Sequence, residues 1–217
     1  MEEKRVTYQS QNSYTTLNSY TKNTKNVWLV FHGMGYLSKF FITFFKGLNP
    51  EENYIIAPQA PSKYYQDFSF KHIGASWLTR EDTANETKNV LNYVDEVAKA
   101  ENISQAQNLI VLGFSQGVSI ATRWLASRKL SCNTLVLHSG GIPEELKPDA
   151  FKHLPETSNV VFLYGNKDEH ITEVRKDHEI TKGNTLFGNR LQIEAFEGIH
   201  EVNTSFINAL GKRLVNC

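Results

Sequence analysis

The chain has little cysteine, and it has no excess of charge of either sign. Only Cys132 and Cys217 are present among 217 residues, which gives neither a disulfide framework nor the paired spacing of a zinc site. Lysine and arginine total 23, as do aspartate and glutamate, so no net charge attracts nucleic acid or an anionic surface. We therefore expect a reducing compartment, no metal and no nucleic-acid partner.

Long hydrophobic runs are also absent. The first residues, MEEKRVTYQS, have no apolar stretch behind their charges, and the longest one, FFITFF, spans only residues 40–45. This predicts a cytoplasmic protein without stable membrane insertion. Hydrophobic residues make up 40% of the chain and aromatic residues 12%, enough for one core, so we expect a single domain over residues 1–217.

Buried strands alternate with helical patterns along most of the chain. Continuous apolar runs, typical of strands covered on both faces, occur at 26–33, 53–61, 108–114, 133–141, 159–166 and 191–196. Helical spacing predicts helices at 37–48, 83–100, 116–130, 172–182 and 200–213. The alternation predicts an α/β fold with helices on both faces of a mostly parallel sheet.

Three segments carry more specific expectations. Residues 5–20 are rich in threonine and tyrosine around a polar break, which predicts two strands joined by a turn and an antiparallel start. Residues 62–80 show no clean period and read as a long loop with apolar content. Thr83 and Glu86 match a capping box at the start of the helix over 83–100.

The stretch VLGFSQG, residues 111–117, places Ser115 between Gly113 and Gly117 where a strand meets a helix. Serine is a common helix cap, and chance supplies such a pattern in roughly one chain in fifteen of this length. A nucleophile elbow needs this junction, with glycines because side chains there crowd the turn. The context therefore favours Ser115 as a nucleophile.

A serine nucleophile needs a base and an acid, in the chain order serine, acid, histidine. His200, in FEGIHEVN, follows a predicted strand and a glycine, and Asp168, in FLYGNKDEH, follows another. Both therefore lie at the carboxyl edge of the sheet beside the elbow. Glu169 remains an alternative acid. The other histidines precede the serine or have structural or surface interpretations: His32, His72, His138, His153, His170 and His178.

An oxyanion hole requires two hydrogen-bond donors. One is the amide of the residue after the nucleophile, Gln116, and the other comes from an early strand–helix loop. The sequence FHGMG at 31–35 offers the Met34 amide between two glycines.

With FHGMG, GFSQG, YGNKD and GIHE in this order, the chain resembles the phospholipase/carboxylesterase family of α/β-hydrolases, which includes acyl-protein thioesterases. APQAP, GASW and HSGGIP also look like family segments, and the resemblance runs from residue 26 to the C-terminus. It implies a compact α/β-hydrolase fold, a triad of Ser115, Asp168 and His200, and oxyanion donors at Met34 and Gln116. The family often has Pro-Val-Val-Pro after the acid, where this chain has EHIT.

These features predict a serine hydrolase that cleaves esters or thioesters of small to medium acyl groups through an acyl-enzyme, without a cofactor. Residues 141–158 are too few for a cap domain, so loops form the walls of an open site. Tyr64, Phe68 and Trp77 are the candidate substrate contacts, while Phe40, Phe41, Phe44 and Phe45 are expected in the core. Amidase, peptidase or acyltransferase activity and non-catalytic ligand binding remain alternatives, and a homodimer stays open.

Overall fold

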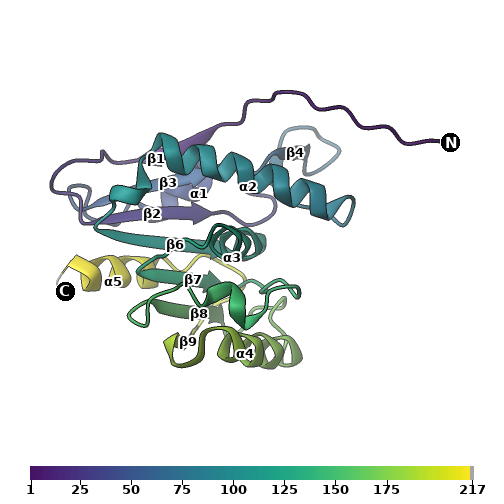
Figure 1. The fold of residues 1–217 in the computed structure, drawn as a ribbon. Helices are drawn as coiled ribbons and strands as arrows, with labels where there is room; N and C mark the ends of the chain where they lie inside the picture. The colour runs from purple at the N-terminus through teal and green to yellow at the C-terminus, as the bar shows by residue number, and fades with distance from the viewer. Residues whose placement is uncertain (216–217) are drawn as a thin grey trace.

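The computed structural model describes residues 1–215, which are built around a seven-stranded sheet (Figure 1). The strand order across the sheet is β1-β3-β2-β6-β7-β8-β9. β1 runs antiparallel to β3, and every other neighbouring pair is parallel. The strands are β1 (Tyr14–Leu17), β2 (Asn26–Phe31), β3 (Asn53–Pro58), β6 (Asn108–Phe114), β7 (Thr134–His138), β8 (Asn159–Gly165) and β9 (Leu191–Phe196).

Helices cover both faces of the sheet, because successive side chains of the central strands enter two different cores. Val27, Leu29 and Phe31 of β2 belong to the core under α2, α3 and α4. Trp28 and Val30 belong to the core under α1 and α5. The helices are α1 (Ser38–Phe41), α2 (Thr83–Ala100), α3 (Gln116–Arg128), α4 (Glu173–Phe187) and α5 (Thr204–Val215). The expected α/β architecture is confirmed.

The region between β7 and β8 confirms the absence of a cap domain. Within residues 139–158 the regular structure is one 3₁₀ helix, Pro148–Phe151. The carboxyl edge of the sheet is therefore covered by loops alone at this point, as the short spacing predicts.

Two expected segments differ from the structure. At the N-terminus one strand forms instead of two: β1 pairs with β3, Asn12 and Ser13 bond to Gln59, and residues 1–11 extend away from the sheet (Figure 1). The expected loop at 62–80 contains a hairpin, β4 (Ser62–Tyr65) paired antiparallel with β5 (Ile73–Ser76). Since all four side chains of β4 are exposed, no alternation of buried and exposed residues marks it in the sequence.

The helices also correct two local expectations. The helix predicted over 37–48 ends after the single turn of α1 and continues as a 3₁₀ helix, Ile42–Phe45. α2 spans the predicted residues, but the capping box is wrong. The Thr83 hydroxyl donates to the Thr79 carbonyl, and Asp82, the residue before the helix, has a φ of 45°.

None of the helices in residues 1–215 combines the length and the apolar character that crossing a bilayer requires. Cys132 is buried, and burial raises the pKa of its thiol to about 12. It is therefore a core residue rather than a reactive thiol. Cys217 lies outside the described residues.

Candidate active site

Ser115 lies on a sharp turn between β6 and α3. Its backbone has φ 51° and ψ −118°, a combination that non-glycine residues rarely adopt. The amide of Ser115 donates to the carbonyl of His138 at the end of β7, at 2.8 Å. This strained turn is the geometry that a nucleophile elbow requires.

The flanking glycines are required by close backbone approaches. A Cβ atom on Gly117 would collide with the Phe31 carbonyl oxygen, and one on Gly113 would collide with the backbone of Val118. Glycine is therefore required at both positions, because α3 packs closely against β2 and β6 there.

Three side chains that are far apart in the sequence form a continuous hydrogen-bonded line. The Ser115 hydroxyl is 3.0 Å from Nε2 of His200, and Nδ1 of the same ring is 2.7 Å from Oδ2 of Asp168. Since a carboxylate only accepts, Nδ1 carries the proton and Nε2 is free to accept from the serine. This is the proton arrangement that an activated serine needs.

Asp168 and its neighbour Glu169 have different environments. The Asp168 side chain has no exposed surface, and its second oxygen accepts the His170 amide at 2.8 Å. The Glu169 side chain is 87% exposed. The contact with His200 is therefore made by Asp168.

The loop FHGMG, residues 31–35, lies against the turn that carries Ser115. A Cβ atom on Gly33 would be 3.2 Å from the Cβ of Ser115. Within residues 1–215 neither the Met34 amide nor the Gln116 amide donates a hydrogen bond to another protein group. Both amides are therefore free to donate to another acceptor.

Trp77 lies behind this loop rather than in an open groove. Its side chain is fully buried, it packs against Phe31, and its indole N–H donates to the His32 carbonyl at 2.8 Å. The Gln116 side chain accepts from the Trp77 amide at 2.8 Å. Trp77 therefore holds the loop of residues 31–35 in place and presents no free surface.

The hairpin residues named as substrate contacts are exposed. Phe68 is 96% exposed between β4 and β5, and Tyr64 is 39% exposed on β4. The hairpin is tied to the loop of residues 31–35, because the Gln66 side chain donates to the Gly35 carbonyl at 2.7 Å and the Gly35 amide donates to the Ala75 carbonyl. Of the expected core phenylalanines, Phe41 and Phe45 are buried, Phe44 is half-buried and Phe40 is exposed.

The ring of His200 lies between two other rings. Phe114 packs on it at a centroid distance of 5.1 Å, and His170 contacts it nearly perpendicularly at 4.7 Å. The His170 side chain is 58% exposed, as the sequence predicts, and its contact with His200 follows from its position two residues after Asp168.

Two other histidines near the site are buried and neutral. The Ala60 amide donates to Nε2 of His32, and the Asn203 amide donates to Nε2 of His138. Burial lowers the pKa of His32 to about 4 and, together with the charge of His200, lowers the pKa of His138 to about 3. Asp168 acts on His138 in the opposite direction.

These lowered pKa values predict acid-sensitive stability. Below pH 6.5 the unfolded chain binds protons at both rings and the native state does not, so the free energy of unfolding falls as the pH drops toward 4. Each ring contributes roughly 1 kcal/mol per pH unit. Denaturant unfolding in a pH series measures the slope, and we expect His138→Gln to reduce it. His72→Gln, at an exposed ring, is the control; an equal slope in both variants would contradict the prediction.

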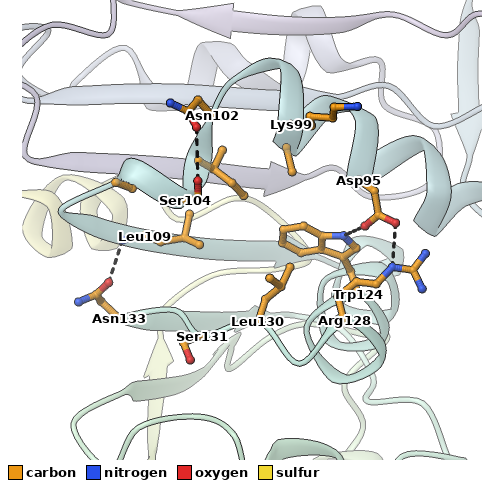
Figure 2. Close-up of a pocket in the computed structure, with 13 residues that line it drawn as sticks. Asp95, Lys99, Asn102, Ser104, Leu109, Trp124, Arg128, Leu130, Ser131 and Asn133 are labelled. Carbon is orange, nitrogen blue, oxygen red and sulfur yellow. Dashed lines mark hydrogen bonds and ion pairs between the residues drawn. The ribbon is translucent and has the colours of Figure 1, made fainter.

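A cavity of about 580 Å³ is lined by Asp95, Trp124 and Leu109 among others (Figure 2), and Leu109 lies at the end of β6 opposite Ser115. Trp124 and Arg128 both donate to the Asp95 carboxylate there, at 2.8 Å each, and Leu109 lies at the start of β6. The described residues contain no group of three or more histidine, cysteine, aspartate or glutamate side chains arranged to hold a metal.

Comparisons with known proteins agree with this architecture. The sequence model of the phospholipase/carboxylesterase family matches residues 12–216. The fold is similar to acyl-protein thioesterase 2 from Zea mays, with 16% identity, a TM-score of 0.70 and coverage of 95% of this chain and 99% of that one. It is also similar to a carboxylesterase from Bacillus cereus, with 14% identity, a TM-score of 0.68 and 94% of each chain covered. A comparison with curated protein sequences gives no match.

Proposed function

The chain belongs to the phospholipase/carboxylesterase family of hydrolases, and we propose that it cleaves carboxylic esters or thioesters of small to medium acyl groups. The observation that carries the proposal is the line of hydrogen bonds from Ser115 through His200 to Asp168. We assign these residues as nucleophile, base and acid, and the Met34 and Gln116 amides as oxyanion donors.

The arrangement supports a two-step reaction. His200 takes the hydroxyl proton as Oγ of Ser115 bonds to the acyl carbon, and the two amides stabilise the oxyanion. The C–O or C–S bond to the leaving group then breaks, and His200 returns the proton to that group. Water attacks the acyl-enzyme, with His200 again acting as base. Asp168 keeps the ring in its productive tautomer and stabilises its charged form.

The same triad also serves amide hydrolysis and acyl transfer, and we propose ester and thioester cleavage because the family whose model matches residues 12–216 is one of phospholipases and carboxylesterases. The proposal includes one domain, a cytoplasmic location, a small-molecule substrate and no cofactor. Rates on ester, thioester and amide substrates with matched acyl groups test it. Turnover of amides alone would overturn it, and binding without turnover would favour a ligand-binding protein.

We further propose that the β4–β5 hairpin forms one wall of the acyl-binding site. Tyr64 and Phe68 would contact the acyl chain of the substrate, and Trp77 would support the loop of residues 31–35. Phe68→Ala is then expected to raise KM for octanoyl esters about fivefold to tenfold, because roughly 1–1.4 kcal/mol of apolar contact is lost. kcat and the acetyl-ester KM should not change. Steady-state kinetics across acyl lengths measure this.

Tyr20→Ala is the matched control for that experiment. Tyr20 is a half-exposed aromatic residue that donates to the Gln105 carbonyl at the far end of the sheet. It should leave KM unchanged at every acyl length. If Phe68→Ala also leaves the octanoyl KM unchanged, the hairpin is not the acyl wall.

A further inference from the structure

His138 lies directly beneath the hydrogen-bonded line at the carboxyl end of β7. Its side chain is fully buried, and its ring packs nearly perpendicularly against Phe114 at 5.0 Å and Phe196 at 5.7 Å. A buried imidazole loses its hydration, which destabilises the folded protein unless its ring nitrogens form hydrogen bonds.

Both ends of this residue contact the catalytic machinery. Its carbonyl accepts the Ser115 amide at 2.8 Å, and its Nε2 accepts the Asn203 amide at 2.9 Å. Asn203 comes three residues after His200 and caps α5, since its side-chain oxygen accepts the Phe206 amide at 2.9 Å. One residue therefore connects the nucleophile elbow to the segment that carries the base.

The base segment has a second anchor on its other side. The carbonyl of Gly198 accepts the Lys167 amide at 2.9 Å, which joins the segment to the loop that carries Asp168. Upstream of His200 the segment is thus fixed to the acid, and downstream it is fixed to His138. Between these anchors only the residues 199–202 are left to set the position of the ring.

We propose that His138 is a positioning residue for the hydrolytic reaction: its ring holds Asn203, and through it the His200 segment, in register with Ser115. This inference rests on the proposed function. An angstrom-scale displacement of a base from its nucleophile costs on the order of 10²-fold in rate, whereas the substrate groove is unaffected. The role therefore acts on kcat rather than on KM.

The ring must remain neutral for this role. Because an amide donates to Nε2, the proton sits on Nδ1, which is 3.1 Å from the Ser139 hydroxyl. In a protonated ring Nε2 would carry a hydrogen and face the N–H group of Asn203, so the hydrogen bond would be lost. Since burial lowers the pKa of His138 to about 3, the acceptor persists at any pH suited to hydrolysis by a neutral His200.

Two substitutions separate positioning from general packing. His138→Leu removes the acceptor, and His138→Gln places a carbonyl oxygen near the Nε2 position. We expect kcat on p-nitrophenyl butyrate to fall roughly 10²-fold in the leucine variant with KM unchanged. The glutamine variant should recover kcat to within about fivefold of the wild type, because one acceptor is restored.

Val136→Ala is the packing control, since Val136 lies two residues earlier on the same face of β7 and is buried. Equal kcat in the leucine and alanine variants, or a glutamine variant as slow as leucine, would overturn the inference. If the leucine variant does not fold, His138→Asn replaces it, because its shorter side chain does not reach Asn203. An inactive wild type would overturn the proposed function and this inference together; an active one with unaffected variants overturns only the inference.

Discussion

Ser115→Ala is expected to lower kcat for ester hydrolysis by roughly 10⁴- to 10⁶-fold, because the acyl-enzyme can no longer form. The remaining activity would come from the oxyanion amides and substrate binding. The variant should also fail to react with a fluorophosphonate probe. Hydrolysis of p-nitrophenyl esters gives the first result, and mass spectrometry of the labelled protein gives the second.

Ser119→Ala is the control for this experiment. Ser119 lies one turn later on α3, where its hydroxyl contacts Arg123 rather than His200. It should keep both activity and labelling. Labelling that persists in Ser115→Ala, or a labelled peptide that does not contain residue 115, would show that another group is the nucleophile.

Much of the site could be predicted because the chemistry of an elbow is local in the sequence. Gly113, Ser115 and Gly117 lie within five residues, and each glycine is needed because a Cβ atom there would collide with nearby backbone. The parallel order of strands then places Asp168 and His200 at the same edge without any knowledge of side-chain geometry. Strand order and position therefore selected His200, but they left Glu169 as an alternative to Asp168.

The remaining features depend on contacts between distant segments. The roles of His138 and Trp77 are set by partners 65 and 45 residues away, Asn203 and His32. The hairpin β4–β5 escaped detection because its first strand is exposed and its tie to Gly35 comes from a glutamine side chain. The capping box failed because Thr83 has its hydroxyl bonded backward to Thr79. Apart from the Thr83–Thr79 hydrogen bond, which spans only four residues, these contacts join distant segments, and no local pattern encodes them.

The choice between Asp168 and Glu169 leads to the second large effect, and the structure determines how it should be tested. Asp168→Asn keeps the size of the side chain. The oxygen of the new asparagine is still needed to accept the His170 amide, so its NH₂ group must face His200. That NH₂ donates to Nδ1 and moves the ring proton to Nε2, where it blocks acceptance from Ser115. We expect kcat to fall about 10⁴-fold with KM nearly unchanged.

Glu169→Gln removes the neighbouring charge and leaves the hydrogen bonds from Ser115 through His200 to Asp168 unchanged, because the Glu169 side chain extends into solvent. Its kcat should therefore stay within about twofold of the wild type, as for surface substitutions outside a site. Steady-state kinetics of both variants on one ester decide the assignment, with melting temperatures to confirm that each is folded. If Glu169→Gln is the slow variant and Asp168→Asn the active one, the acid of the triad is Glu169, and its loop must rearrange when substrate binds to bring that carboxylate to His200.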